Sequence, residues 1–350
     1  MGDVYAEFQL AKGLTFKTNF GLDIANKRDY NYTTSKITTS TGYGKGGNGY
    51  TKKMSRLTEN ILSYMNEWGD HRFTATGVYS WQNYMYETLS ISGNGFANDE
   101  TGAWDMGQAN RETVEYGSDK YENSLISWTG RVTYAYKDRY LLTATARYDG
   151  SSRFGENNKW GFFPSIGLAW RASEEEFLAG NKVITNLKVR GSFGVTGNQE
   201  IGNYKSLAQL KVDNYIYNDT EIQGFYETIG NPDLKWERAN QFDIGIDLSL
   251  WNRIHVTADY YHRKTSDLLY NVPIPSTSGF SSMLSNVGSV LNKGWELSIT
   301  GNIIDLNDLK IDATVNLSRN TNKIKELYND VQSITLKSGL GLSSYLGFTK

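Results

Sequence analysis

The glycine-rich run Gly42-Tyr-Gly-Lys-Gly-Gly47 is one of the few segments whose residue types could do chemistry. It fits G-x-G-x-x-G, a pattern with which dinucleotide-binding folds cradle phosphates. Such a site needs a surrounding βαβ unit, but none is indicated here and no helix follows the glycines, so the run is interpreted as a flexible loop. Lys45 is followed by Gly46 rather than by Ser or Thr, which excludes a Walker loop.

The three histidines, His71, His255 and His262, are too dispersed to form a metal cluster, and the chain has no cysteine. His255 and Asp259 would share one face of a strand, where a hydrated wall explains them better than a metal site or a proton-transfer pair. A hydrolase would need a serine with a histidine in reach, and no local spacing supplies one. We therefore expect no enzyme activity, no cofactor and no metal site.

The run Glu174-Glu-Glu176 is acidic enough to suggest acid–base chemistry, but its context indicates a helix start. Ser173 precedes it, and Ser173-Glu-Glu-Glu176 matches a capping box in which the serine caps the helix and Glu176 reaches back. We predict a short helix in this connection rather than a catalytic site.

The elements that carry these residues repeat one pattern, in which apolar and polar residues alternate over about ten positions before a turn. Within 140–149, Leu142 and Ala144 fall on one face, whereas Thr143 and Arg147 fall on the other. A period of two over this length predicts a β-strand that is wet on one side and apolar on the other. The pattern recurs over 72–81, 128–136, 140–149, 187–196, 241–250, 253–260, 294–303 and 309–318.

Composition agrees with an all-β, antiparallel transmembrane β-barrel. Only 39% of the 350 residues are hydrophobic, and no run of eighteen apolar residues occurs, which excludes a helical membrane protein. The 24 Tyr and 9 Trp suit the aromatic belts at membrane interfaces, and proline, at 4 residues, is scarce, as a backbone ladder requires. A net charge of -2 gives no electrostatic footprint for nucleic acid.

The connections alternate in length, which predicts short turns on one rim and long loops on the other. Counting from turn to turn gives about twelve strands, several of them much longer than the ~10 residues that a membrane needs. The long strands are 14–33, 51–67, 71–92 and 253–271; the short turns are 11–13, 68–71, 137–139, 251–253 and 305–308; and the long loops are 34–50, 94–120, 154–160, 197–234 and 271–285.

Four motif regions, in order, resemble the barrel of SusC/RagA-type TonB-dependent outer-membrane transporters of the Bacteroidota. The resemblance covers most of residues 120–350, whereas 1–119 resemble the family only in strand pattern and loop length. The motifs are Asp149-Gly-Ser-Ser-Arg-Phe-Gly155 continuing to Trp160-Gly-Phe-Phe-Pro-Ser-Ile-Gly-Leu-Ala-Trp170, then Leu187-Lys-Val-Arg-Gly-Ser-Phe-Gly-Val-Thr-Gly-Asn198, Asn231-Pro-Asp-Leu-Lys-Trp-Glu237 and Asn286-Val-Gly-Ser-Val-Leu-Asn-Lys-Gly-Trp-Glu296.

The resemblance implies energised import of oligosaccharides or peptides through a Gram-negative outer membrane. It also implies a SusD-like surface lipoprotein that closes over the barrel and the TonB–ExbB–ExbD system as energy source. A signal peptide, an N-terminal extension, a plug and the C-terminal strands of such barrels are not visible in the sequence. About twelve strands also cannot close a barrel of about 22. We therefore expect residues 1–350 to be one part of a larger plugged barrel.

Two sets of residues are candidates for contacts in such a transporter. Charged residues on the polar faces would meet the plug or line the permeation path, unless they only solvate the wall. Loop aromatics would stack on substrate or on the lipoprotein lid, unless they pack within their loops. The charged set is Arg131, Arg147, Asp149, Lys188, Arg190, Asp243, Asp247, Asp259 and Arg263, and the aromatic set is Trp104, Tyr116, Tyr215, Tyr217, Phe225 and Tyr226.

Two alternatives remain open. A passive porin or an adhesin would have the same strand pattern, and only the family motifs argue against it. A soluble β-sandwich would bury the apolar face. Aromatic residues at strand ends suit an interface better than a core, among them Tyr79, Trp81, Tyr134, Tyr136, Tyr148, Trp170 and Trp295.

Overall fold

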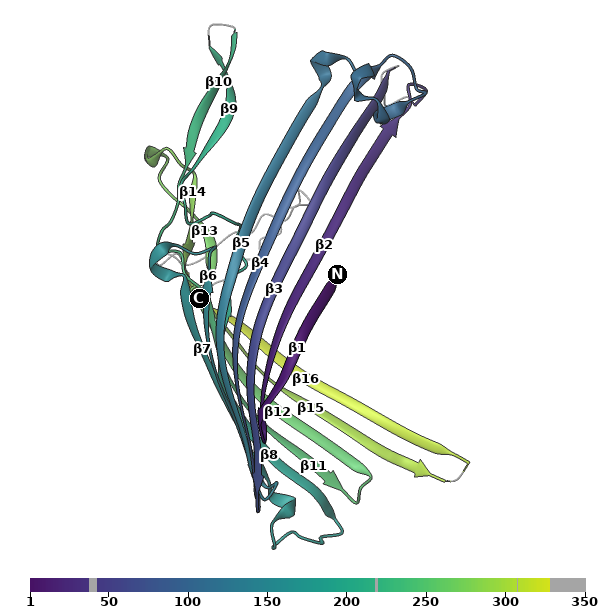
Figure 1. The fold of residues 1–350 in the computed structure, drawn as a ribbon. Coiled ribbons are helices and arrows are strands. Elements are labelled where there is room, and N and C mark those ends of the chain that lie inside the picture. Colours follow the sequence, from purple (N-terminus) through teal and green to yellow (C-terminus); the bar gives the residue numbers. More distant parts are fainter. Residues whose placement is uncertain (38–42, 218–219, 307, 328–350) are drawn as a thin grey trace. The chain divides into compact units, whose positions relative to one another are not determined.

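The fold is a long antiparallel sheet whose neighbouring strands follow one another along the chain (Figure 1). A computed structural model describes residues 1–37, 43–217, 220–306 and 308–327. In this part of the chain twelve strands form one sheet, in the order β1-β2-β3-β4-β5-β6-β7-β8-β11-β12-β15-β16. Their bounds are β1 Gly2–Ala11, β2 Leu14–Thr33, β3 Gly44–Trp68, β4 His71–Phe96, β5 Glu115–Tyr136, β6 Tyr140–Ser151, β7 Trp160–Arg171, β8 Ile184–Asn198, β11 Glu237–Leu250, β12 Ile254–Ser266, β15 Ser289–Asp305 and β16 Lys310–Glu326.

Two smaller hairpins and several single-turn 3₁₀-helices lie in the long connections. The hairpins pair β9 (Gln209–Tyr217) with β10 (Thr220–Thr228) and β13 (Leu269–Pro273) with β14 (Ser282–Asn286). No described helix is long and apolar enough to cross a membrane. The 3₁₀-helices are η2 Gly102–Trp104, η3 Met106–Gln108, η4 Arg111–Thr113, η5 Glu156–Asn158, η6 Ala172–Glu174 and η7 Ser276–Ser278.

The chain divides into two compact units. Unit 1 comprises Met1–Phe8, Lys17–Asn60 and Ser80–Ile126, and unit 2 comprises Gln9–Phe16, Ile61–Tyr79 and Ser127–Lys350. Unit 1 therefore holds the long-loop ends of β2 to β5. Unit 2 holds the four family motifs and all nine charged candidate residues.

The predicted twelve-stranded antiparallel sheet is confirmed, and so are the short turns between its strands. The strand expected over 253–271 is too long, because β12 ends at Ser266 and a positive φ of 57° at Asp267 turns the chain into β13. The long connections 197–234 and 271–285 are not plain loops, since each carries β-structure of its own. The chain end after residue 327 lies outside the described residues.

Unit 2 has an apolar face and a polar face, as the alternation predicts. On the apolar face Ile246 of β11 lies opposite Val189 of β8 and Ala258 of β12, so one row of apolar side chains crosses three strands. This apolar face is not buried, since Ile246 is 39% exposed, Ile244 47% exposed and Leu168 58% exposed. A continuous apolar face left open to its surroundings is what a lipid-facing wall requires.

The prediction of a flexible loop at the glycine run is wrong for its described part. Gly44 to Gly47 begin β3, and Gly44, Gly46 and Gly47 are buried. A Cβ at Gly46 would lie 2.8 Å from both Ala103 Cβ and Tyr32 Cδ2, so its glycine lets the β4–β5 connection pack directly on the strand. Gly42 lies outside the described residues.

The predicted capping box is also wrong. Residues Ala172–Glu174 form the single-turn η6, whose N-cap is Arg171 rather than Ser173, and the Ser173 hydroxyl is buried without a hydrogen-bond partner. The carboxylate of Glu174 pairs with Arg171 at 2.8 Å. Glu175 instead binds aromatic residues of the neighbouring strands, so tertiary contacts displace the local cap.

The two faces predict opposite effects for neighbouring substitutions in β6. We expect Ala144→Arg to impair insertion of the full-length barrel, because an arginine facing lipid near mid-bilayer costs about 2–4 kcal/mol. Thr143→Arg, on the polar face, is the matched control and should insert nearly as well as the wild type. The measurement is the folded fraction in lipid vesicles, read from heat-modifiable electrophoretic mobility. Equal yields for the two variants would contradict the assignment of the faces.

Candidate functional site

A cluster of charged side chains occupies the polar face of unit 2. Arg190 of β8 donates from Nη2 to Asp259 of β12 at 2.8 Å and from Nε to Asp247 of β11 at 3.3 Å. Lys188 Nζ lies 3.9 Å from the same Asp247 carboxylate. Two cations and two carboxylates from three strands therefore form one network, which we call the Arg190 cluster. Its members are about one-third exposed, so water reaches it.

A glycine makes the Arg190 cluster possible. In the register of the sheet, Gly245 lies between Arg190 on β8 and Asp259 on β12. A Cβ at Gly245 would collide with the Asp259 carboxylate and lie 2.7 Å from the Arg190 guanidinium carbon. The missing side chain thus lets Arg190 reach across the intervening strand.

Arg147 and Asp149 form a second ion pair on the same face. Arg147 Nε donates to both oxygens of Asp149, at 2.7 and 2.8 Å, and its Nη2 donates to the Ser127 hydroxyl at 3.0 Å. Asp149 and Ser127 are buried although they are polar, because each has a partner here. This pair fastens β6 to β5.

The other charged candidates are dispersed along the same face. Asp243 accepts from Gln241 Nε2 at 2.9 Å and from the Ser192 hydroxyl at 3.3 Å. Arg131 and Arg263 occupy exposed positions of β5 and β12. Beside the Arg190 cluster the surface holds a shallow hollow of about 270 Å³, whose lining includes Thr143, Gly167, Lys188, Arg190, Ser192 and Asp243. His255 bonds to the Ser249 hydroxyl at 2.9 Å instead of facing Asp259, so these two residues form no pair.

Most of the family motifs converge on one packed core at the long-loop ends of β6 to β8 and β11. Trp236 is its centre: its ring lies 4.9 Å from that of Phe154 and 5.2 Å from that of Phe163, and its indole N–H donates to the Lys159 carbonyl at 3.0 Å. Leu234 and Phe154 are almost wholly buried, at 0% and 1% exposed. We call this group the motif core.

Glycines at Gly155, Gly161 and Gly197 belong to the motif core as well. A Cβ at Gly155 would collide with the Pro232 carbonyl, and one at Gly161 or Gly197 would collide with the Phe163 ring. Sequence reasoning used these motifs for recognition but missed what they build. The signal was present in the motifs, since all four contain a large aromatic residue and three of them also contain glycine.

The motif core anchors the long connections. The Asn231 side-chain amide donates to the Leu284 carbonyl of β14 at 2.8 Å. Asn286 accepts from the Lys235 N–H at 2.9 Å and donates back to the Lys235 carbonyl at 2.7 Å, while Lys235 pairs with Asp267 at 2.9 Å. The β13–β14 hairpin is therefore tied to the 231–237 motif by side chains that imitate backbone pairing.

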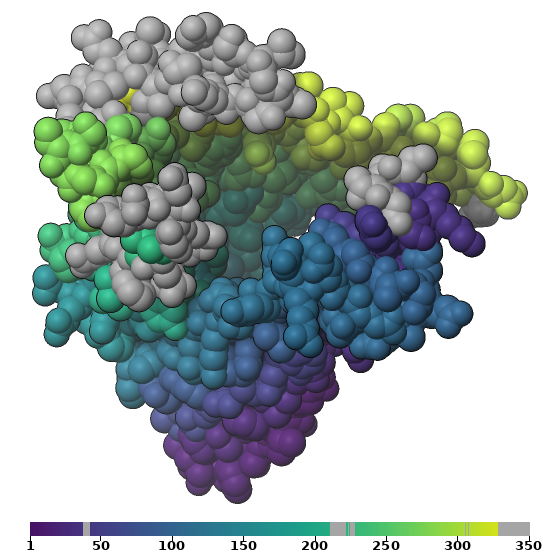
Figure 2. Space-filling model, turned by 90° about the horizontal axis from the view of Figure 1, so that it is seen from above, coloured from purple at the N-terminus to yellow at the C-terminus, as the bar shows by residue number. Residues whose placement is uncertain are grey.

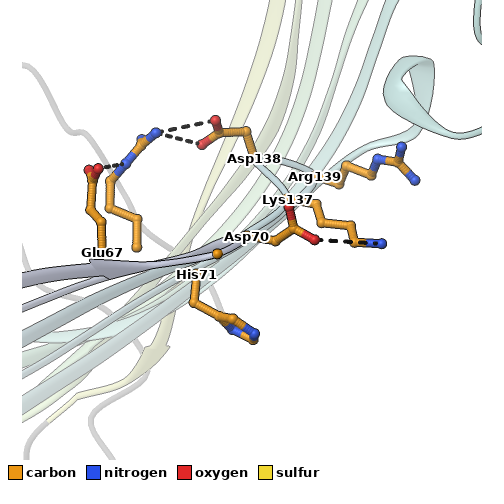
Figure 3. Close-up of a pocket in the computed structure, with 8 residues that line it drawn as sticks. Glu67, Asp70, His71, Lys137, Asp138 and Arg139 are labelled. Atoms are coloured by element: carbon orange, nitrogen blue, oxygen red, sulfur yellow. Dashed lines mark hydrogen bonds and ion pairs between the residues drawn. The ribbon is translucent and has the colours of Figure 1, made fainter.

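At the opposite, short-turn rim, two turns are joined by ion pairs around a hollow of about 460 Å³ (Figure 3). Arg72 bridges Glu67 at 3.0 Å and Asp138 at 3.1 Å, and Lys137 lies 3.8 Å from Asp70. Three acidic and three basic side chains line this hollow, so their charges cancel and favour neither cations nor anions. We interpret it as a fastening between turns.

Aromatic side chains follow the same rim. His71 points away from the ion pairs in Figure 3 and lies between Trp68 and Tyr136, with centroids at 5.5 and 4.9 Å. Glu175 accepts hydrogen bonds from the Tyr140 hydroxyl at 2.6 Å and from the Trp170 indole at 3.1 Å. These two bonds, together with nearby Arg139, lower the pKa of Glu175. The ionised Glu175 carboxylate thus joins Tyr140 and Trp170 of the aromatic belt.

In unit 1, the β4–β5 connection is clasped to the end of β2. Asp99 accepts from the Ser35 N–H at 3.0 Å, the Ser35 hydroxyl at 2.7 Å and the Tyr32 hydroxyl at 2.9 Å. The Ser35 bonds, with that of Tyr32, lower the pKa of Asp99, while desolvation and the bond to Asp99 raise the pKa of Tyr32 to about 12. The connection forms part of the dense blue block in the space-filling view (Figure 2).

The aromatic candidates lie in two places. Trp104 and Tyr116 belong to unit 1, and both are exposed, at 62% and 87%. Trp104 stacks on Tyr30 at 4.6 Å, with the Arg28 guanidinium 4.6 Å from its ring centroid. Tyr215 and Tyr217 lie in β9 and Phe225 and Tyr226 in β10, and their side chains are outside those that the structure describes. Their roles, like those of the charged set, stay predictions.

Comparison with known proteins gives consistent matches along the chain. Residues 2–346 match the model of the family described as TonB dependent receptor-like, beta-barrel. TonB-dependent receptor P3 of Formosa agariphila is 37% identical over 328 residues, which are 92% of this chain and 32% of that protein. TonB-dependent receptor SusC of Bacteroides thetaiotaomicron is 39% identical over 224 residues, or 62% of this chain and 22% of that protein.

This chain belongs to the TonB-dependent receptor β-barrel family. A solved structure of the RagAB peptide transporter matches with a TM-score of 0.86 and 30% identity over 95% of this chain and 37% of that one. The resemblance to SusC/RagA-type receptors is thereby confirmed. Members are outer-membrane transporters rather than enzymes, and this chain spans about a third of the length of P3 and of the RagAB chain.

The motif core predicts a large effect for its central tryptophan. We expect Trp236→Ala in the full-length protein to lower the free energy of unfolding by about 3–5 kcal/mol, because it removes a large buried side chain and leaves a cavity. Trp160→Ala is the control from a neighbouring motif: Trp160 is 45% exposed and stacks on the exposed ring of Tyr148, so about 1 kcal/mol is expected. Denaturant unfolding in detergent measures both. Equal losses would show that Trp236 is not the centre of a core.

The Asp99 clasp predicts a two-sided pH dependence. Because the pKa of Asp99 is lowered, its contribution is complete above the ordinary Asp value near 4 and is lost as the pH falls below it. Because the pKa of Tyr32 is raised, its contribution is complete below about 10 and is lost between about 10 and 12. Hydrogen exchange over 97–114, corrected for intrinsic rates, should show protection that falls several-fold at both extremes. Asp99→Asn should remove the acid limb, and a wild-type profile that is flat in acid would refute the clasp.

Proposed function

We propose that this chain forms part of the wall of an energised outer-membrane importer of oligosaccharides or peptides. In this proposal a SusD-like surface lipoprotein closes over the long-loop side, and the TonB–ExbB–ExbD system supplies energy. Similarity to SusC and to the RagAB peptide transporter over most of the chain supports the proposal. Similarity to a peptide transporter, RagAB, makes peptides one substrate class to test.

The observation that carries the proposal is the polar face of unit 2. A wall that only needs hydration requires scattered polar groups, whereas the Arg190 cluster joins charges of both signs from three strands in one fixed arrangement. Fixed, partly exposed charges beside a hollow suit repeated contact with a movable polar partner, which in this family would be the plug or the passing substrate. We assign the nine charged candidates to that partner-facing surface.

The anchored connections support binding on the long-loop side. The β9–β10 hairpin is paired over nine residues on each strand, and its base is closed by Gln209 N–H donating to the Thr228 hydroxyl at 3.2 Å. Tyr215, Tyr217, Phe225 and Tyr226 all lie in this hairpin. A hydrated polymer gains little from any one contact, so several aromatic and amide groups on an ordered arm favour its capture.

Shortening the hairpin tests this assignment. Replacing 211–226 by two glycines in the full-length protein keeps the base at Gln209 and Thr228, so barrel assembly should be unchanged. Uptake of labelled oligosaccharides or oligopeptides, or co-purification of the lipoprotein, should fall at least tenfold. The control replaces residues 276–279 of the β13–β14 hairpin by two glycines. In this variant we expect uptake and lipoprotein co-purification to change less than threefold. Normal uptake together with normal lipoprotein association would refute the assignment.

A passive porin or an adhesin is the competing function, and energy dependence separates it from an importer. Uptake by the full-length protein in cells should stop when a protonophore collapses the proton gradient, because TonB-type import needs that gradient. Uptake that continues at an unchanged rate would support a passive pore. Surface attachment without any uptake would support an adhesin.

A further inference from the structure

Three tyrosines of unit 1 lie together on one face of β4 and β5, which are neighbours in the sheet and run toward the long loops (Figure 1). The ring of Tyr121 in β5 stacks on that of Tyr86 in β4, with centroids 4.7 Å apart and planes at 13°. The ring of Tyr84, two residues earlier in β4, lies 6.3 Å from that of Tyr121. We call these three rings the tyrosine platform. Neither the Arg190 cluster nor the motif core includes it.

The register of β4 and β5 puts the tyrosine platform on the polar face of these strands. Asn83 Nδ2 donates to the Ser124 hydroxyl at 3.0 Å on one face, and a Cβ at Gly117 would lie 3.4 Å from the Ser90 hydroxyl on the other. Both contacts belong to the same pairing of the strands, so no bulge between them exchanges the faces. Asn83 follows Trp81 on the side of β4 that is apolar in its lower half. The platform, on alternate positions, therefore lies on the opposite, channel side.

The outward side of the same strands shows that the tyrosine platform lies above the hydrocarbon layer. At this level the outward side carries Asn83, Glu87, Lys120 and Glu122, with Met85 as an apolar exception. Charged side chains that face lipid are disfavoured near mid-bilayer and are tolerated close to the interfaces. The pattern of the spanning strands is thus inverted here, with aromatic rings on the channel side and charges outside. Hydration of the wall does not account for three aromatic rings on its channel side.

The side chains around the tyrosine platform offer hydrogen bonds and nearly balanced charge. Gln82 shares its face, as do Thr51 and Thr88, whose hydroxyls lie 3.4 Å apart. Desolvation and the two neighbouring tyrosines raise the pKa of Tyr121, and the nearby Lys53 ammonium opposes this rise. The charged residues on this face of β2 to β5 in unit 1 are Lys17, Asp23, Lys27, Asp29, Lys45, Lys53, Glu59, Glu115 and Asp119. Cations and carboxylates nearly cancel, which favours neither an anionic nor a cationic ligand.

A buried donor beside the tyrosine platform lacks a partner. Asn123 lies two residues after Tyr121 on the same face of β5. Its side-chain Nδ2 is buried and has no hydrogen-bond partner among the described residues. A buried donor left unsatisfied costs free energy, which an acceptor brought by a ligand would recover. A ligand rich in hydroxyl groups supplies such acceptors.

This combination of groups fits a neutral sugar. The apolar C–H face of a sugar ring packs on an open aromatic ring, and tyrosine, threonine and amide side chains bond to its hydroxyls. Peptides are often captured by pairing with a free strand edge, which β4 and β5 lack because each has a neighbour on both sides. We propose that the tyrosine platform binds neutral oligosaccharides on the channel side of the wall. This inference rests on the proposed import function and selects one of its two substrate classes.

The test measures binding to the full-length protein in detergent by titration calorimetry. The probes are neutral hexasaccharides of glucose, mannose, galactose, xylose or fructose, and a neutral hexapeptide of glycine, alanine and serine. For any sugar that the wild type binds, Tyr86→Ala and Tyr121→Ala should each weaken binding at least tenfold. Tyr86→Phe keeps the ring and should weaken it less than threefold. Heat-modifiable mobility checks that each variant is folded.

The matched control is Met85→Ala. Met85 lies between Tyr84 and Tyr86 in β4 but on the outward side, so its substitution should leave sugar affinity unchanged. Equal losses in the Met85 and Tyr86 variants would overturn the facing. The proposal would be overturned if the wild type bound none of the sugars, if both alanine variants kept full affinity, or if the tyrosines were needed for the hexapeptide instead. Loss of lipoprotein co-purification with unchanged sugar binding would also overturn it and assign the rings to the lid.

Binding in detergent needs no proton gradient, so this test is separate from that of energised import. Tyrosine-dependent sugar binding together with uptake that resists a protonophore would support the platform and refute the importer. Uptake that stops with the protonophore, together with sugar binding that ignores the tyrosines, would support the importer and refute the platform.

Discussion

The backbone hydrogen-bond ladder is the constraint on which this structure depends. In hydrocarbon an unpaired N–H or C=O costs several kcal/mol, so a chain that crosses a bilayer as strands must pair each strand with its neighbours. Pairing in extended form makes side chains alternate with a period of two, so the face of each residue is fixed by its position in the strand. The exposed apolar row through Ile246 and the polar row through Asp247 are two consequences of one ladder.

The same alternation organises the candidate function. Arg190, Gly245 and Asp259 lie opposite one another on three successive strands, so an arginine, a gap and a carboxylate form an ion pair that no local sequence window contains. The alternation that exposes the apolar row therefore also brings the Arg190 cluster together on the other face of the same strands.

Strand existence, strand number and the short turns follow from the sequence, because they depend on local alternation and on turn residues. What could not be predicted depends on contacts between distant segments. The 172–174 turn is a clear case, because Ser173 and Glu176 have the residue types of a capping box and yet form none. Instead, Glu175 accepts hydrogen bonds from Tyr140 and Trp170, which lie on two neighbouring strands. The glycine run is another case, because Ala103, far along the chain, packs against Gly46 where a side chain would not fit. The charged candidates were found by face, whereas their partners Ser127, Ser192 and Gln241 were missed, because register was unknown.

The most direct test of the two-faced wall is a scan of single cysteines along β11 in a cysteine-free, full-length background. Phe242→Cys, Ile244→Cys and Ile246→Cys would carry a fluorophore quenched by brominated lipid, whereas Gln241→Cys, Asp243→Cys and Asp247→Cys would react with a membrane-impermeant thiol reagent. The structure predicts strict alternation between these two behaviours across the six positions. Quenching that varies smoothly along the strand, or reagent access at Phe242 and Ile246, would contradict it.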